Sequence, residues 1–155
     1  MKIAIASDHA GFELKKYFIK LLKESDSTIE IVDMGPDLYD KDDDYPVYIK
    51  KVAEYISQND NPEEYRGIII GGSGQGENIC ANKYKNVRSV LIYCNDMISN
   101  HNMAKVTRQH NDANVISFGA RFIEQCNAFD VLQTWLAEKF TGDPRHVRRL
   151  SKLEN

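Results

Sequence analysis

Short apolar runs alternate with amphipathic segments along almost the whole chain. Apolar runs of this length, rich in isoleucine and valine, favour strands, whereas apolar residues recurring every three or four positions favour helices. An aspartate at position 96 is well placed to cap the fourth helix. The pattern predicts strands at 2–6, 28–32, 68–70, 87–93 and 115–118, helices at 12–23, 47–56, 76–83, 97–109 and 123–140, and a basic tail at 141–155.

Apolar strands separated by helices are typical of a parallel sheet that is covered on both faces. The expected fold is therefore a three-layer α/β/α sandwich with a five-stranded, parallel, Rossmann-like sheet, in a single domain spanning residues 1–155. Strand order cannot be read from one sequence. Ligands of such sheets bind beyond the carboxyl ends of the strands, which directs attention to the loops at 7–11, 71–77, 94–96 and 118–121.

The loop after the third predicted strand contains four glycines in six residues, GGSGQG at 71–76. Glycines let a ligand approach backbone N–H groups, and the start of the following helix adds unpaired donors, so the segment suits an anion. It does not fit the GxGxxG, Walker or GxSxG patterns. A tight strand-to-helix turn and a functional loop remain equally good interpretations of the spacing alone.

Composition restricts the classes of function. The chain has 155 residues, 42% hydrophobic and 28% charged, with a net charge of −3, which does not favour nucleic acid. No apolar run is long enough to cross a bilayer, and no signal peptide is evident. Three widely spaced cysteines suggest reduced, mostly buried thiols in a cytoplasmic protein, and four histidines show no metal-binding spacing. We expect no metal and no cofactor.

Five segments occur in an order that resembles the ribose/galactose isomerase family of sugar-phosphate isomerases. They are SDHAGFELK at 7–15, DYP at 44–46, GGSGQGENICANK at 71–83, RQHNDANVISFGAR at 108–121 and RHVRR at 145–149. The resemblance covers nearly the whole chain. It implies an α/β/α fold, a metal-free interconversion of aldose and ketose phosphates, and a homodimer or a tetramer built from such dimers.

The resemblance also implies a base. Many family members carry a catalytic cysteine directly after the third strand, where this chain has Gly71, whereas a subset uses a glutamate that corresponds to Glu77. Glu77 would move a proton between C2 and C1 of the sugar, while Ser73 and the N–H groups of Gly74 and Gly76 hold the enediolate oxygen. A helix start lowers the pKa of a carboxyl group and burial raises it, so the sequence leaves the pKa of Glu77 open. Ser73 could instead bond its own turn.

The remaining site residues follow from the same resemblance. His110 would open the sugar ring, Asn111 would fix sugar oxygens, Asp8 and His9 would contact the hydroxyls and the phosphate end, and Tyr45 and Gly72 would line the pocket. Asp8 could also simply cap the first helix, and His110 could merely favour a helix C-terminus. The tail could be a solvated surface. The cations expected at the phosphate are Arg121, Arg145, His146 and Arg149.

Topology adds an inference of its own. Glu77 follows strand three at the carboxyl edge of the sheet, whereas His110 ends a returning helix at the amino edge. We therefore expect composite sites in a symmetric dimer, with the tail reaching the partner subunit. The expected reaction is the interconversion of ribose 5-phosphate and ribulose 5-phosphate. The alternatives are another sugar phosphate (a tetrose phosphate, allose or galactose 6-phosphate) and a noncatalytic module that binds phosphorylated sugars.

Overall fold

A single parallel sheet forms the centre of the protein. The computed structural model describes residues 1–94 and 96–153, and within them five strands pair in the order β2-β1-β3-β5-β4, all parallel. This confirms the expected α/β class. The strands are β1 (Lys2–Ser7), β2 (Glu30–Asp33), β3 (Tyr65–Gly71), β4 (Ser89–Ile92) and β5 (Val115–Gly119).

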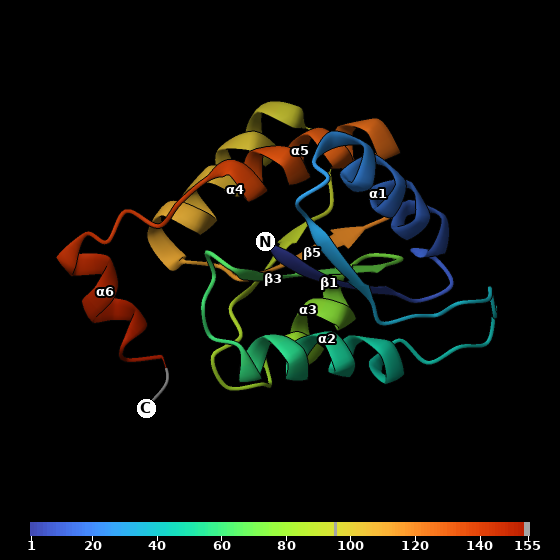
Figure 1. The fold of residues 1–155 in the computed structure, drawn as a ribbon, viewed down its shortest axis with the longest axis horizontal. Coiled ribbons are helices and arrows are strands. Elements are labelled where there is room, and N and C mark those ends of the chain that lie inside the picture. Colours follow the sequence, from blue (N-terminus) through green and yellow to red (C-terminus); the bar gives the residue numbers. More distant parts are fainter. Residues whose placement is uncertain (95, 154–155) are drawn as a thin grey trace.

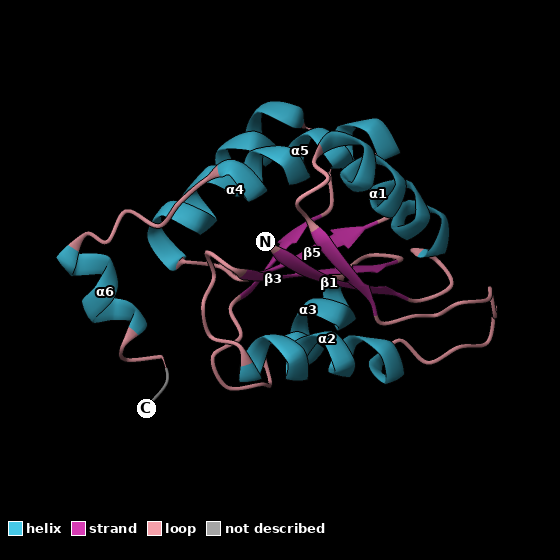
Figure 2. Ribbon diagram, in the orientation of Figure 1, coloured by secondary structure: helices cyan, strands magenta, loops and turns pink. Residues whose placement is uncertain are grey.

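Helices cover both faces of the sheet (Figures 1 and 2), which gives the three layers. Helices α1, α4 and α5 lie on one face and α2 and α3 on the other, while the short helix α6 stands at one end of the molecule. Each face has its own apolar core, and the larger one surrounds Phe18, Phe118 and Trp135. The helices are α1 (Phe12–Ser25), α2 (Pro46–Gln58), α3 (Gln75–Ala81), α4 (Met97–Asn111), α5 (Gln125–Ala137) and α6 (Pro144–Leu150).

Local signals explain most of these elements. Leu14, Phe18 and Leu22 recur at intervals of four and are all buried on one face of α1. The Asp96 side chain accepts a hydrogen bond from the Ser99 N–H at 3.2 Å, so the predicted cap of α4 is confirmed.

The strand order creates a switch point between β1 and β3. From β1 the chain moves outward to β2, and it then returns to pair β3 with the other side of β1. The carboxyl ends of these two strands diverge into different loops, and such a crevice is where open parallel sheets bind ligands. The segments entering it are 8–11 from β1 and 72–74 from β3.

The predicted start of β2, the predicted end of α5 and the description of the tail were wrong, as was one burial prediction. Thr28 belongs to a turn closed by the Asp26 carboxylate, so β2 starts only at residue 30. Helix α5 ends at residue 137 because the buried guanidinium of Arg66 occupies the carbonyls of Trp135 and Leu136, both at 2.9 Å. The tail contains a helix, α6, that we did not expect. Cys94 and Cys126 are exposed rather than buried.

Two expectations reach beyond the described residues. The tail was expected to extend over 141–155, of which 154 and 155 lie outside the described residues. The loop at 94–96 includes Asn95, which lies outside them as well.

Candidate active site

The end of strand β3 holds the neighbouring loops in place. Its last carbonyls accept hydrogen bonds from loops that follow both adjacent strands: Ile70 from the Asp8 N–H at 3.1 Å, Gly71 from the Ala120 N–H at 2.9 Å, and Gly72 from the Arg121 N–H at 3.1 Å. These loops after β1, β3 and β5 therefore form one connected floor at the carboxyl edge. That floor brings together Asp8, His9, Gly72, Ser73 and Arg121.

The glycines of the 71–76 loop are needed for close contacts. Gly74 has φ +73°, and a Cβ there would lie 2.9 Å from the backbone of Phe118. At Gly76 a Cβ would lie 2.8 Å from the hydroxyl oxygen of Tyr45, which places the Tyr45 ring directly against the start of α3. The loop is thus both a tight turn and a close packing surface for the DYP segment.

Glu77 is buried under this loop, with 4% of its surface exposed. A Cβ at Gly71 would lie within 2.5 Å of the carboxyl carbon and both carboxyl oxygens of Glu77. The carboxyl group therefore occupies the space that any side chain at position 71 would fill. The observed position of the Glu77 carboxyl therefore requires glycine at position 71.

Burial raises the pKa of Glu77 above its ordinary value. Its own backbone N–H lowers the pKa, the charge of Asp8 raises it further, and desolvation is the largest of these effects. Desolvation therefore outweighs the hydrogen bond from the Glu77 N–H in the first turn of α3. A carboxylate with a raised pKa is a stronger base.

Two backbone donors remain available beside Glu77. A helix leaves its first four N–H groups without partners inside the helix, and here those belong to residues 74–77. The Gln75 N–H donates to Ser73 Oγ at 3.3 Å, and the Glu77 N–H donates to its own carboxylate. Among the described residues, the N–H groups of Gly74 and Gly76 have no hydrogen-bond partner, and these are the two donors named from the sequence. Ser73 makes the local turn bond, and because its hydroxyl oxygen only accepts there, its proton is available to another group.

Asp8 and His9 form the β1 side of the crevice. Asp8 Oδ1 accepts from the Gly11 N–H at 2.9 Å, so it closes the turn before α1, whose N-cap residue is Gly11 and has no side-chain cap. The Arg121 guanidinium lies over Gly72, 3.2 Å from where its Cβ would be. The His9 ring nitrogen Nδ1 lies 2.6 Å from Asp43 Oδ1.

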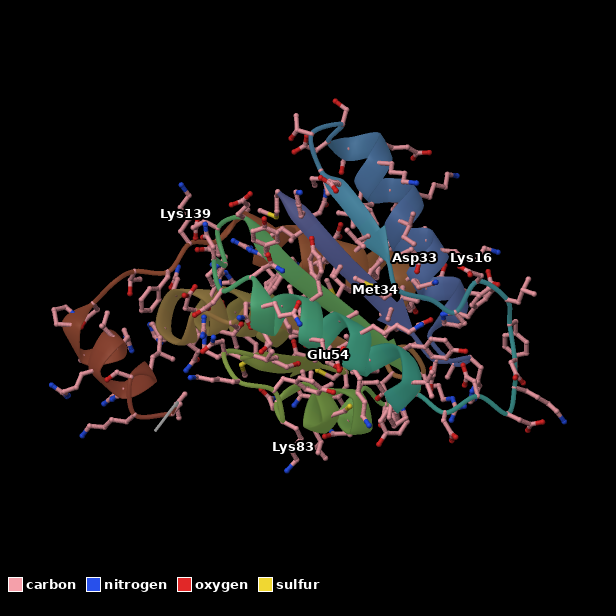
Figure 3. All side chains as sticks on the ribbon, turned by 60° about the horizontal axis from the view of Figure 1, so that its bottom comes forward. Lys16, Asp33, Met34, Glu54, Lys83 and Lys139 are labelled. Atoms are coloured by element: carbon pink, nitrogen blue, oxygen red, sulfur yellow. The ribbon has the colours of Figure 1, made fainter. Side chains whose placement is uncertain are left out.

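Sequence reasoning missed Asp43. It lies in the acidic segment 34–45, whose start is fixed by the buried ammonium of Lys15, which donates to Asp33 at 2.7 Å and to the Pro36 carbonyl at 2.8 Å. Asp33 and Met34, where this segment leaves the sheet, are labelled in Figure 3. The segment contains aspartates at 37, 40, 42, 43 and 44, and no sequence signal separates the one that contacts His9 from the others.

The remaining candidates gather at the opposite edge of the sheet. The His110 ring stacks on the His146 ring, with centroids 4.3 Å apart and planes at 13°, and Arg145 Nε lies 3.3 Å from His146 Nε2. Burial lowers the pKa of His146, and the neighbouring His110 and Arg145 lower it further. Asn111 is exposed beside this cluster.

A hydrogen bond places the end of α4, and with it His110, at the amino edge of the sheet. Arg88 immediately precedes β4, and its Nε donates to the carbonyl of Asp112, the residue that ends α4, at 2.9 Å. Figure 1 shows α6 at the end of the molecule away from the 34–45 loop. One chain therefore brings together Glu77, Ser73, Asp8, His9, Tyr45 and Arg121, and it does not bring His110, Asn111, Arg145, His146 or Arg149 to them.

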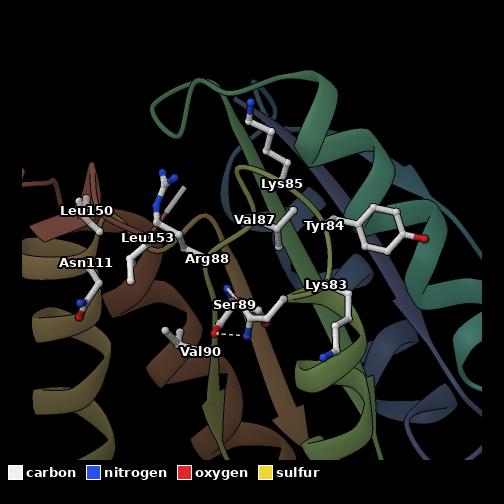
Figure 4. Close-up of a pocket in the computed structure, with 11 residues that line it drawn as sticks. Lys83, Tyr84, Lys85, Val87, Arg88, Ser89, Val90, Asn111, Leu150 and Leu153 are labelled. Carbon is white, nitrogen blue, oxygen red and sulfur yellow. Dashed lines mark hydrogen bonds between the residues drawn. The ribbon is translucent and has the colours of Figure 1, made fainter. Parts of the chain in front are cut away.

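A hollow of about 580 Å³ opens at the amino edge (Figure 4). Its lining includes Lys83, Lys85 and Arg88 together with Asn111, and Leu150 and Leu153 lie on the tail side. The hollow adjoins the His110 cluster and contains none of the residues around Glu77. It is thus a feature of the second cluster alone.

Within the described ranges no group of three histidine, cysteine, aspartate or glutamate residues is arranged to hold a metal ion. Among the helices of the same ranges, none has both the length and the apolar character required to cross a membrane.

The fold and the site define the class of protein. Within the described residues, a parallel α/β sheet carries at its carboxyl edge a buried carboxyl group with a raised pKa and two backbone N–H donors without a partner, an arrangement typical of an enzyme. The family model described as Ribose/Galactose Isomerase matches residues 3–153, and the chain belongs to the ribose/galactose isomerase family. It is therefore an isomerase, as the sequence resemblance implied.

Individual relatives agree with this assignment. The chain is 40% identical, over 100% of its length and 96% of the relative's, to a putative sugar phosphate isomerase of Bacillus subtilis. It is 34% identical to the ribose-5-phosphate isomerase B of Mycolicibacterium paratuberculosis, covering 99% of this chain and 89% of that one. The crystal structure of ribose-5-phosphate isomerase B from Mycoplasma genitalium with bound ribulose-5-phosphate superposes with a TM-score of 0.88 at 35% identity, covering 98% of this chain and 93% of that one.

Proposed function

We propose that this protein interconverts ribose 5-phosphate and ribulose 5-phosphate, with Glu77 as the base. The observation that carries the proposal is the buried Glu77 carboxylate, held over Gly71 with a raised pKa beside two available N–H donors. The relatives named as ribose-5-phosphate isomerase B, one of them with bound ribulose-5-phosphate, support the choice of sugar.

The proposed reaction moves one proton between adjacent carbons. Glu77 takes the proton from C2 of the aldose, and negative charge develops on the carbonyl oxygen as the enediolate forms. The N–H groups of Gly74 and Gly76 and the Ser73 hydroxyl stabilise that oxygen. The hydroxyl proton on O2 passes to O1, and Glu77 returns its proton to C1, which gives the ketose and restores the carboxylate.

The other groups bind, orient and open the sugar. Asp8, Tyr45 and Gly72 line the crevice, and Arg121 lies beside it for the anionic end of the substrate. In this proposal His110 opens the ring, Asn111 fixes sugar oxygens, and Arg145, His146 and Arg149 grip the phosphate, whose binding energy positions the reacting carbons. Since these five lie at the amino edge, we propose that the partner in a homodimer supplies them.

Substitution of Glu77 by glutamine tests the base. Glu77→Gln keeps the shape and the hydrogen-bonding capacity but cannot accept a proton from carbon. Ribulose 5-phosphate formation from ribose 5-phosphate should fall by at least 10³-fold, while binding of ribose 5-phosphate, measured by calorimetry, should stay within a fewfold of the wild type. Undiminished turnover in this variant would exclude Glu77 as the base.

Mixing two inactive variants tests the composite site. Glu77→Gln and His110→Gln subunits, denatured and refolded together, form heterodimers in which one site has both defects and the other has neither. About a quarter of the wild-type activity should return, because half of the dimers are mixed and each has one intact site. No recovery, with mixed dimers confirmed by native mass spectrometry, would mean that each site is built from one chain.

The family name includes galactose, so the sugar itself needs a direct comparison. Initial rates on ribose, erythrose, allose and galactose phosphates should be highest for ribose 5-phosphate. A higher kcat/KM for another sugar phosphate would replace the substrate and leave the chemistry of Glu77 unchanged.

A further inference from the structure

The acidic segment 34–45 makes one contact with the crevice that its sequence does not reveal. Asp43 Oδ1 accepts from the backbone N–H of His9 at 3.2 Å and lies 2.6 Å from His9 Nδ1. One carboxylate oxygen thus holds both the main chain and the ring of His9. Because an ionised carboxylate only accepts hydrogen bonds, this contact places a proton on Nδ1 and directs Nε2 away from Asp43.

Asp43 is itself buried, with 3% of its side chain exposed. Within the described residues its second oxygen, Oδ2, has no hydrogen-bond partner, and His9 is its only ion-pair partner. An ionised carboxylate removed from water needs a counter-charge. The counter-charge available in the structure is the imidazolium form of His9.

We propose that Asp43 is a positioning residue that fixes the orientation of His9 and keeps its ring positively charged, which suits the contact with the phosphate end of the sugar that the family resemblance assigns to His9 and Arg121. The part of this inference that concerns the sugar rests on the proposed function. The pairing of Asp43 with His9 does not.

The surroundings of His9 agree with this role. Asp8 on the same loop and Asp43 on the 34–45 segment both raise the pKa of His9, the hydrogen bond to Asp43 being the largest effect, whereas burial and Arg121 lower it. The Tyr39 ring meets the His9 ring edge-on at 6.3 Å. Without the pairing, a second negative charge next to the crevice would oppose an anionic ligand. With the pairing, the His9 imidazolium neutralises the buried Asp43, and the His9 ring keeps the proton that it donates to the phosphate.

The test compares Asp43→Asn with Asp42→Asn. Both remove one negative charge from neighbouring positions, but the Asp42 side chain is 81% exposed, and its one ion pair within the described residues is with Lys41. The pKa of His9 is measured by NMR titration, with the His9 signal assigned by its absence in His9→Gln. Asp43→Asn should move this pKa downward and Asp42→Asn should leave it in place. An equal His9 pKa in both variants overturns the proposal.

Substrate affinity provides the second measurement. At a pH between the His9 pKa values measured for the wild type and for Asp43→Asn, the variant should raise KM for ribose 5-phosphate and the dissociation constant for inorganic phosphate by about tenfold, the difference between a charged and a neutral donor. Its kcat should stay within twofold of the wild type, and at a pH below both measured values, where His9 is protonated in either protein, the affinities should converge. Unchanged phosphate affinity at the intermediate pH refutes the role of His9 at the phosphate even if the pKa moves.

Thermal melting separates this proposal from loss of folding and from failure of the proposed isomerase function. His9→Gln leaves the buried Asp43 charge without its partner and should lower Tm, and adding Asp43→Asn to it should restore Tm. That non-additivity requires neither turnover nor substrate. Additive losses would show that the two side chains do not form a pair.

Discussion

Alanine at position 71 would separate the geometry of the base from the stability of the fold. Gly71 has no positive φ, so alanine can adopt its backbone conformation. The added Cβ would come within 2.5 Å of all three atoms of the Glu77 carboxyl, whereas ordinary contact begins at 3.4 Å. The carboxyl must therefore move by about 1 Å or more, and it can do so because it is the end of a flexible side chain.

The expected cost falls on catalysis. A displacement of about 1 Å from the productive geometry costs on the order of 10²-fold in rate, which is about 2.7 kcal/mol of transition-state stabilisation. We expect Gly71→Ala to reduce kcat for ribose 5-phosphate by about this factor, with KM nearly unchanged, and to alter the free energy of unfolding in urea by less than about 1 kcal/mol.

A neighbouring substitution serves as the comparison. A Cβ at Gly72 meets the guanidinium of Arg121 at 3.2 Å instead of the base, so Gly72→Ala should affect KM more than kcat. If Gly71→Ala keeps the wild-type kcat, then either the carboxyl is not where catalysis needs it or its position is unimportant, and the reasoning fails.

Three further predictions concern stability. Because burial raises the pKa of Glu77, the folded state binds its proton more tightly than the unfolded state, so the stabilisation is present at low pH and disappears as pH rises through the raised value. Glu77→Gln should therefore melt a few degrees above the wild type at pH 7 and show no advantage below pH 4. Arg66→Met should lower the free energy of unfolding, measured in urea, by about 3 kcal/mol, since it leaves buried carbonyls at the end of α5 unpaired. The pKa of His146 is lowered in the folded state. The stabilisation of the fold by its neutral ring is therefore lost as pH falls from the ordinary histidine value near 6.5 through the lowered value. Hydrogen exchange in α6 should accelerate below that pH, and should not do so in His146→Phe.

The sequence predicts the layers and most of the elements because their signals are local. Leu14, Phe18 and Leu22 define the buried face of α1 without reference to the rest of the chain. The end of α5 depends instead on Arg66, which is about 70 residues away and fully buried. A long-range contact of this kind leaves no periodic trace, so the predicted helix ran three residues too far. Helix α6 did have a local signal, Asp143 followed by Pro144, which caps and begins it.

The site residues also divide into those with a local sequence signal and those defined by long-range contacts. Glycine spacing and the carboxyl-edge rule located residues 71–77, and family resemblance identified Glu77 within them. The raised pKa of Glu77 depends on how deeply the carboxyl is covered, which only the assembled fold determines. Asp43 could not be chosen among five aspartates, because its distinction is a contact with His9 across 34 positions of the chain.

The end of β3 holds the loops on both of its sides. Three successive carbonyls, those of Ile70, Gly71 and Gly72, anchor the loops that follow β1 and β5. The position of the strand end therefore sets the positions of both loops and of the side chains that they carry into the crevice. Lengthening β3 by a single residue would therefore shift the loops after β1 and β5 together instead of disturbing one of them.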